Sequence, residues 1–459
     1  MNASRAAARS ADLALFGATP VLPRGPAGDP HGTWPIVTDD ERRAVARVLD
    51  RGILSGAQAP EATALEEEFA RYVGARYCLL THCGTSALSI ALAATGVRAG
   101  DEVIVPAYSF VATPLAVLHV GAIPVFVDID DATGCLDPAA IDGAVTAHTR
   151  AILPVHMHGC AADMAAIVAC ARRHSLRIVE DAAQAHGATC EGRRVGALGD
   201  AGGFSLQSSK NLPAGEGGLF VTNDGAVASE ANSLRNFGQD VWLAEAAGCD
   251  AARPLDGARV LDSKRIGSMY RGNELAAAFA RAQLARLPEL TERCQRNAER
   301  LARALGELPG VDPPRAVPGR TSVHHKFRVR LDPERAGLGV TPRQLRDATM
   351  RALVAEGLEV VLWQAAPLPA QTLFRQRDAT LGFPRPRPGG TDLAANYEPS
   401  RYPRSQALLD GSFVLFSQSC PLIAQPAAVV DRYAEAFQRV WNHRDALAAW
   451  AVRQSGSIG

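Results

Sequence analysis

The hydrophobic pattern of residues 60–225 alternates between helical and strand periods. Segments 62–72, 85–94, 110–120 and 164–173 have the period of amphipathic helices. Short apolar runs typical of strands lie between and after them, at residues 78–81, 103–105, 124–128, 151–156, 177–180, 203–206 and 219–221. Because apolar strands that alternate with helices need crossover connections, the pattern predicts an α/β domain with a mainly parallel central sheet flanked by helices.

The rhythm changes beyond about residue 280. Apolar residues then recur every three or four positions, as in a long helix, at Leu290, Cys294, Ala298, Leu301, Leu305 and Leu308. Residues 327–331 alternate between apolar and polar, as in a strand with one solvent-exposed face. Thr341-Pro342 is expected to begin a helix that ends near residue 357, and residues 360–362 to form another strand. We therefore expect a loose N-terminal arm (1–35), a large α/β domain (36–285) and a smaller α+β domain (286–459). Residues 366–405, rich in Pro, Arg and Gly, are expected to form a long loop, either a lid or a surface excursion.

Composition and charge narrow the class of protein. The 459 residues carry 48 Lys plus Arg and 48 Asp plus Glu, so no net charge favours nucleic acid or an anionic membrane. No run of 18 uncharged apolar residues could span a membrane, and the first 35 residues lack the apolar core of a signal peptide, so we expect a cytoplasmic protein. Nine cysteines without a C-x-x-C pair argue against a disulfide framework or a zinc ribbon.

Lysine is unusually scarce in this chain. Of the 48 basic residues, only Lys210, Lys264 and Lys326 are lysines. Arginine evidently serves wherever a simple positive charge is enough. A remaining lysine is therefore a candidate for chemistry that needs a neutral amine, such as forming a Schiff base.

Three segments carry candidate chemistry. In residues 79–88 a strand runs into a Gly-Thr-Ser turn that opens a helix, where backbone N–H groups and the helix dipole favour a phosphate, although the turn could equally be a simple capped helix start. Glu180 and Asp181 end an apolar strand, at the edge where open α/β sheets bind ligands, although they could be a solvated acidic pair. Lys210 stands among small residues before a Gly-rich turn, where an ordinary surface lysine is the alternative that its scarcity disfavours.

An anion cradle, a carboxylate and an amine together form the set that pyridoxal phosphate requires. The cradle anchors the phosphate, the aspartate keeps the pyridine nitrogen protonated, and the lysine carries the aldehyde as an imine. These residues lie in the motifs GTSAL, DEVIVPAYSFVAT, GAIPVFVDID, ILPVHMHGCAADM, VEDAAQAHGA, FSLQSSKNLPAGEGG and ELAAAFARAQLARL. Across residues 30–445 the chain resembles the DegT/DnrJ/StrS-type aminotransferases, a branch of the fold-type-I pyridoxal phosphate enzymes.

The resemblance implies a role for each matching residue. Lys210 is then the Schiff-base lysine, Asp181 the partner of the pyridine nitrogen, and Gln184 the hydrogen-bond donor to the 3′-oxygen. Phe110 stacks on the cofactor ring, with Tyr108 as the runner-up. The phosphate ligands are Gly84, Thr85, Ser86 and Ser205.

One position departs from the family pattern. Family members commonly have G-x-N-x-R after the lysine, with an Asn that reaches the phosphate of the neighbouring subunit, whereas this chain has Met269 at that place. Asn273 or Arg271 substitutes for it, or the phosphate has one contact fewer. His156 and His158 could face one side as metal ligands, but no third ligand is spaced to help, so we expect packed or hydrogen-bonded histidines and no metal site.

The resemblance implies an enzyme, a pyridoxal phosphate aminotransferase that forms pyridoxamine phosphate in its first half-reaction. Its donor is expected to be glutamate or glutamine, and its acceptor a keto-sugar or keto-cyclitol in amino-sugar or antibiotic biosynthesis. The arm sequence LALFGATPV and residues 366–405 resemble the members that aminate cyclitols. A homodimer with the site at its interface, and no nucleic-acid or membrane partner, is expected. The alternatives are a lyase or dehydratase on the same scaffold and a catalytically silent partner protein.

Overall fold

The computed structural model describes residues 12–23, 29–56, 59–239 and 262–455, together with the backbone of four short strands between residues 240 and 261. Its centre is a seven-stranded sheet in the order β1-β9-β8-β5-β4-β2-β3. Strand β9 pairs antiparallel with β1 and with β8, and the other pairs of neighbouring strands in this sheet are parallel. The strands are β1 (Tyr77–Thr81), β2 (Glu102–Pro106), β3 (Ile123–Val127), β4 (Thr149–Ile152), β5 (Arg177–Asp181), β8 (Ala201–Ser205) and β9 (Gly218–Thr222).

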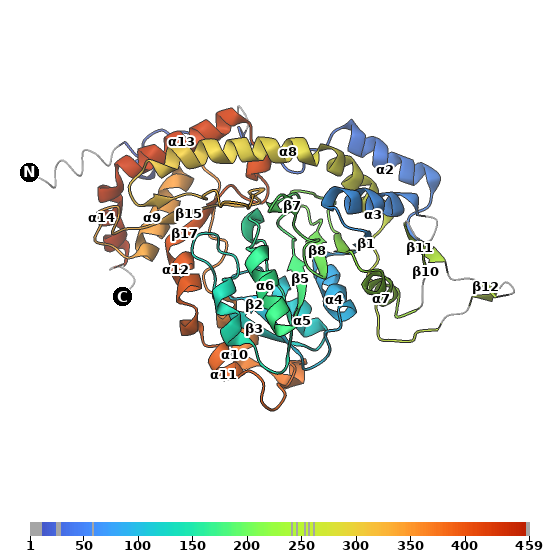
Figure 1. The fold of residues 1–459 in the computed structure, drawn as a ribbon. Helices are drawn as coiled ribbons and strands as arrows, with labels where there is room; N and C mark the ends of the chain where they lie inside the picture. Colours follow the sequence, from blue (N-terminus) through green and yellow to red (C-terminus); the bar gives the residue numbers. More distant parts are fainter. Residues whose placement is uncertain are drawn as a thin grey trace, which may run out of the picture.

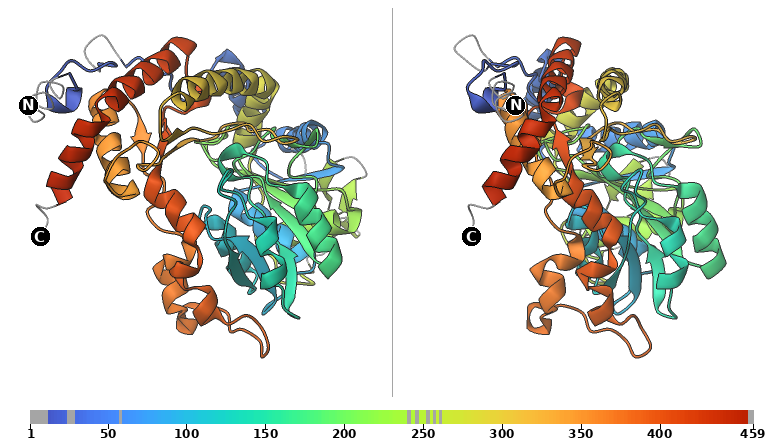
Figure 2. Two further views of the ribbon diagram at one scale, coloured as in Figure 1. Left: turned by 60° about the vertical axis from the view of Figure 1, so that its left-hand side comes forward. Right: turned by 90° about the vertical axis from the view of Figure 1, so that its left-hand side faces the viewer.

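Helices cover both faces of this sheet (Figures 1 and 2). Side chains of β5 show the two faces, because Ile178 lies in one buried cluster and the next residue, Val179, in another. Strands buried on both faces read as continuous apolar runs, which is why the pattern could be recognised in the sequence. The helices are α2 (Asp39–Arg51), α3 (Pro60–Val73), α4 (Gly84–Ala94), α5 (Ala112–His119), α6 (Met164–His174) and α7 (Gly225–Arg235).

A single helix, α8 (Glu274–Gly306), joins the large sheet to a smaller α+β part (Figure 1). The predicted boundary at residue 285 therefore falls inside a continuous helix. The smaller part has a four-stranded antiparallel sheet in the order β14-β15-β17-β16. Its elements are β14 (Val311–Asp312), β15 (Phe327–Leu331), α9 (Pro342–Ala355), β16 (Val360–Val361), β17 (Ser412–Leu415), α13 (Ala427–Asn442) and α14 (Arg444–Ser455).

Residues 366–405 are not a long loop. They contain the short helices α10 (Thr372–Gln376) and α11 (Leu393–Asn396) and lead into α12 (Pro403–Gly411), and they lie beside the large sheet in both views of Figure 2. Phe374 and Tyr397 pack on Phe126 of β3, and the Tyr397 hydroxyl donates to the carbonyl of Pro124 at 2.7 Å. The apolar residues are spread too thinly among Pro, Arg and Gly to show a helical period in the sequence.

The arm is not loose where the structure describes it. Leu13, Val21 and Leu22 are buried in the core of the smaller part. The backbone N–H groups of Ala14 and Val21 both donate to the carboxylate of Glu356, at 2.9 and 3.0 Å. The arm is therefore fixed by hydrogen bonds and by apolar packing.

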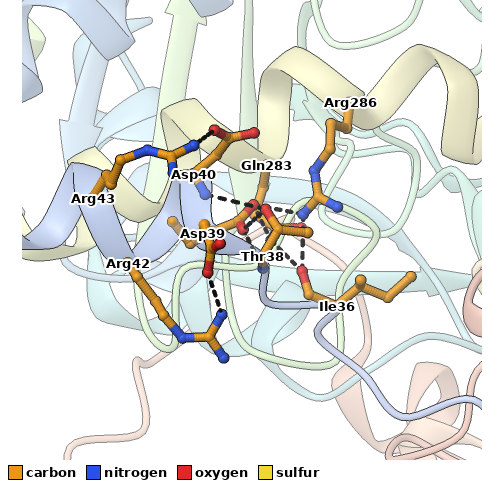
Figure 3. Close-up of polar contacts among 9 residues, drawn as sticks. Ile36, Thr38, Asp39, Asp40, Arg42, Arg43, Gln283 and Arg286 are labelled. Atoms are coloured by element: carbon orange, nitrogen blue, oxygen red, sulfur yellow. Dashed lines mark hydrogen bonds and ion pairs between the residues drawn. The ribbon is translucent and has the colours of Figure 1, made fainter.

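Helix α2 is docked on α8 in part through the buried carboxylate of Glu41, and Figure 3 shows Thr38, Gln283 and Arg286 around this contact. Glu41 accepts hydrogen bonds from the Thr38 N–H at 2.6 Å, from Gln283 at 2.9 Å and from Arg286 at 2.5 Å. Burial alone would raise the pKa of Glu41, but the Thr38 hydrogen bonds and the Arg286 charge outweigh it and lower the pKa. The capping box that starts α2 therefore also fixes its position on α8.

Candidate active site

The candidate residues follow four strands that end at one edge of the large sheet. Asp181 is the last residue of β5, and β8, its parallel neighbour, leads through Ser205 to Lys210. Strand β1 leads into α4, and β2 leads to Phe110 before α5. Because the carboxyl ends of parallel strands meet at one edge, residues separated by up to 126 positions are brought to one place.

Asp181 is buried and held by a chain of hydroxyl groups. The Thr113 hydroxyl donates to Asp181 Oδ2 at 2.7 Å, and the Ser109 hydroxyl lies 2.8 Å from that of Thr113. The N–H of Ala183 donates to Asp181 Oδ1 at 3.1 Å. Burial raises the pKa of Asp181, while the Thr113 bond and the Lys210 charge partly oppose the rise. A cation placed against this carboxylate would therefore be strongly favoured.

Glu180 has a different role from its neighbour, because successive strand residues point to opposite faces. It is fully buried and accepts backbone hydrogen bonds from Gly196, Leu198 and Gly199 at 2.6 to 2.7 Å, and it lies 3.1 Å from His156 Nε2. The two acids are thus not a solvated pair. Glu180 secures the loop before β8, and Asp181 faces the candidate site.

Lys210 lies in the loop between β8 and β9. Its N–H donates to the carbonyl of Gln207 at 2.8 Å, and its own carbonyl accepts from the indole N–H of Trp34 at 3.1 Å. Burial lowers the pKa of Lys210 to about 8, and the nearby Asp181 carboxylate only partly opposes this. The amine is therefore available in its neutral form close to physiological pH.

The first turn of α4 packs tightly against the end of β8. A Cβ atom on Gly84 would lie 2.8 Å from the Cβ of Ser205, so only glycine permits this approach. The Ser86 hydroxyl lies 2.6 Å from His82 Nδ1 and donates to the carbonyl of Cys83 at 3.0 Å. The Thr85 hydroxyl makes no side-chain hydrogen bond within the described residues. Gly84, Thr85 and Ser205 thus lie together, as a candidate cradle, at the positive end of α4, while the Ser86 hydroxyl is already hydrogen-bonded to its neighbours in the turn.

The two candidate stacking rings differ in exposure. Tyr108 is buried, with its hydroxyl 2.7 Å from His158 Nε2 and its ring edge-on to Trp363. Phe110 is 55% exposed. Phe110 is therefore the more accessible of the two rings.

Gln184, three residues after Asp181, has an amide N–H₂ group that can act as a hydrogen-bond donor. Its Oε1 accepts from the His158 N–H at 3.0 Å, and its amide nitrogen makes no hydrogen bond within the described part of the chain. An amide donor held in this way suits an anionic oxygen, such as the 3′-oxygen of a pyridine cofactor.

The histidines singled out in the sequence have separate partners. His156 accepts from the N–H of Ala162 at 3.0 Å and contacts Glu180, whereas His158 contacts Tyr108. The expectation that both are packed and hydrogen-bonded is confirmed.

Met269 lies partly exposed near the strand that feeds the cradle. His82 N–H donates to the carbonyl of Tyr270 at 2.8 Å, which holds this segment against the end of β1. Asn273 caps α8 by accepting from the N–H of Ala276 at 2.9 Å, so its oxygen is used within the chain. Met269, Arg271 and Asn273 line one cavity of about 390 Å³ together with His82.

Two contributors were missed in the sequence. Thr113, which donates to Asp181, lies 68 positions before it in the chain. Trp34, which donates to the Lys210 carbonyl, lies in the arm, 176 positions before Lys210. No local pattern marks either residue, because each acts through a contact made only in the folded chain.

The fold and this arrangement define a fold-type-I aminotransferase, as known proteins confirm. The crystal structure of 3-amino-5-hydroxybenzoic acid synthase superposes with a TM-score of 0.75 at 31% identity, covering 89% of this chain and 98% of that one. A putative L-glutamine:3-amino-2,3-dideoxy-scyllo-inosose aminotransferase of Streptoalloteichus tenebrarius is 36% identical over 444 residues, 95% of this chain and 100% of its own length. The L-glutamine:scyllo-inosose aminotransferase of Streptomyces griseus is 39% identical over 380 residues, 81% of this chain and 84% of its own.

The model of the DegT/DnrJ/EryC1/StrS aminotransferase family matches residues 35–385. The chain belongs to this family, and the expectation drawn from its motifs is confirmed. No described helix is long and apolar enough to cross a membrane.

Replacing Thr113 by Val tests the support of Asp181. The change keeps the shape of the side chain and removes one hydrogen bond to a buried carboxylate, so we expect kcat of the amino transfer to fall roughly 10- to 100-fold. Thr113→Ser retains the hydroxyl and should keep most of the activity. Equal kcat values for the wild type and the Val variant, measured by steady-state kinetics, would show that this hydroxyl has no role.

Proposed function

We propose that this protein transfers an amino group from glutamine or glutamate to the ring ketone of a keto-cyclitol or a related keto-sugar, with pyridoxal 5′-phosphate bound at Lys210. The observation that carries the proposal is the meeting of buried Asp181, Lys210 with its lowered pKa and the α4 cradle at one sheet edge. The acceptor class is supported by two relatives named as inosose aminotransferases. The product would be an aminated cyclitol.

The donor set fits the cofactor at each of its polar groups. Gly84, Thr85 and Ser205 would hold the phosphate, with Ser86 supporting the turn, Asp181 would hold the ring nitrogen, and Gln184 the 3′-oxygen, while Phe110 would cover a ring face. When bound, pyridoxal phosphate would supply a carbonyl that joins an amine and a ring that accepts electrons.

The protein's own contribution is to hold charge and to move protons. Asp181, fixed by Thr113, favours a proton on the nitrogen that faces it. Lys210 Nζ takes a proton from the α-carbon of the donor in the first half-reaction and returns one to the former ketone carbon in the second. A pKa of about 8 suits an amine that must both accept and release a proton near neutral pH.

The same proposal includes a homodimer with the site at its interface. Ile266 is 97% exposed, and Phe237 and Met269 are about half exposed. An isolated antiparallel β-bridge between Asn236 and Met269 joins the two segments that carry these side chains. Large apolar side chains grouped on a surface are typical of contacts between subunits. In such a dimer, Met269 would take the place at which other family members present an Asn.

Substitution of Lys210 tests the proposed reaction directly. With L-glutamine and scyllo-inosose or 2-deoxy-scyllo-inosose, mass spectrometry should detect the aminated ring, and Lys210→Arg should lower its formation by roughly 10²- to 10⁴-fold. Lys264→Arg, at an exposed lysine, is the matched control and should leave the rate unchanged. Release of the keto acid without an aminated ring would indicate a lyase, and full activity in Lys210→Arg would refute the role of this amine.

The lowered pKa of Lys210 predicts the pH dependence of cofactor attachment. Only the neutral amine reacts with an aldehyde, and a pKa of about 8 leaves on the order of a tenth of it neutral at pH 7. The rate at which the apoprotein binds pyridoxal phosphate, followed by absorbance, should therefore rise through pH 8 and level off above about pH 9. A rate that keeps rising to pH 10 would indicate an ordinary lysine.

A further inference from the structure

A cavity of about 360 Å³ lies between the large sheet and the smaller part of the molecule. It is lined by the 3-10 turn η4 (Met157–Gly159), by residues 131–133 and 312–315, and by the entry to β15. Its charged and polar walls are predominantly basic. We call the set His158, Lys326, Arg328 and Arg330 the basic wall.

Two cations of the basic wall have no anionic partner among the residues that the structure describes. Lys326 is 7% exposed and Arg328 is half-buried, and neither side chain makes a hydrogen bond or an ion pair within the described residues. Other cations around the cavity are paired, since Arg335 and Arg315 donate to Asp312 at 2.7 and 2.6 Å. Leaving a positive charge both buried and unpaired is costly, so the arrangement is explained by an anion that enters the cavity.

His158 adds an unused donor to the same wall. Burial raises the pKa of Tyr108, which therefore keeps its proton and can donate it to His158 Nε2 at 2.7 Å. Burial and the Arg328, Lys326 and Lys210 charges hold the pKa of His158 well below its usual value, so the ring is neutral. Its proton then lies on Nδ1, which is buried and has no partner in the described structure.

The basic wall adjoins the candidate active site. The backbone N–H of His158 donates to Oε1 of Gln184. Burial lowers the pKa of Lys326 to about 8, and the nearby positive charge of Lys210 adds to this effect. An anion bound between these two amines would interact favourably with both. An amino acid donor carries such an anion, whereas the ring ketone of a cyclitol is uncharged.

Resting on the proposed function, we propose that the basic wall binds the carboxylate of the amino donor and of its keto-acid product, through Lys326 and Arg328 with His158 Nδ1 as a further donor. The reacting amine and its acceptor then use different contacts in one site. The donor is recognised by charge, and the cyclitol by the remaining polar groups. This division lets two chemically unlike substrates react in turn at Lys210.

The proposal is tested on the holoenzyme with glutarate, a dicarboxylate that has no amino or keto group and cannot react. Calorimetry should show glutarate binding to the wild type, weakened roughly tenfold or more in Lys326→Met and in Arg328→Gln. Arg335→Gln, which changes a paired cation of the same cavity, is the matched control and should bind glutarate as the wild type does. The KM for glutamine should rise in the first two variants while the KM for the ring ketone stays within about twofold.

Thermal unfolding separates this role from a structural one. Without ligand, Lys326→Met removes a buried charge that has no anionic partner in the described part of the chain, so the variant should melt at or above the wild-type temperature. The proposal would be overturned if the wild type did not bind glutarate, or if both variants bound it with unchanged affinity. It would also be overturned if inorganic phosphate alone competed for the basic wall. Because glutarate binding needs no turnover, absent amination with intact binding would refute the proposed function and leave the carboxylate site standing.

Discussion

The site depends on the burial of two groups of opposite charge at the ends of adjacent parallel strands. Burial disfavours the charged form of each, so it raises the pKa of Asp181 and lowers that of Lys210. Each group also stabilises the charge of the other, but for Lys210 burial is the larger effect. The result is an amine that loses its proton easily, beside a carboxylate that gains from any cation placed against it.

The surrounding structure serves to hold these two groups in place. Glu180 fixes the loop before β8 through three backbone N–H groups, and Thr113 fixes the Asp181 carboxylate. The indole N–H of Trp34, in the arm, donates to the carbonyl of Lys210 and so holds the Lys210 loop. The same physical logic extends to the basic wall, where buried Lys326 and half-buried Arg328 have no anionic partner among the described residues and are proposed to bind a carboxylate.

Much of this could be predicted from the sequence, because parallel strands buried on both faces leave a continuous apolar signal. Each of the seven strands of the large sheet overlaps one of the predicted apolar runs. Asp181 and Ser205 end strands, and Gly84 and Lys210 lie in segments that follow strands, at the edge where ligands bind. The scarcity of lysine marked Lys210, and the same signal also marked Lys326, whose surroundings became visible only in the fold. The prediction of a long loop at residues 366–405 was wrong because Phe374 and Tyr397 are buried against the large sheet, and their spacing in the sequence shows no helical period.

Contacts between segments that are distant in the chain could not be predicted from the sequence. Nothing near Thr113 or Trp34 indicates a partner 68 or 176 residues away. The separate roles of Glu180 and Asp181 follow from the alternation of strand side chains, but which face meets the site depends on the packing of the whole sheet. Similarly, the exposed fractions of Tyr108 and Phe110 distinguish the two rings, and their neighbours in sequence do not determine those fractions.

The central claim is that the Lys210 amine bonds covalently to the aldehyde of pyridoxal phosphate. Borohydride reduction of the holoenzyme, followed by peptide mapping by mass spectrometry, tests it directly, because the chain has only three lysines to distinguish. The account predicts a reduced cofactor adduct on the peptide that contains Lys210 and none on Lys264 or Lys326. An unmodified Lys210, or an adduct on Lys326 in its place, would contradict it.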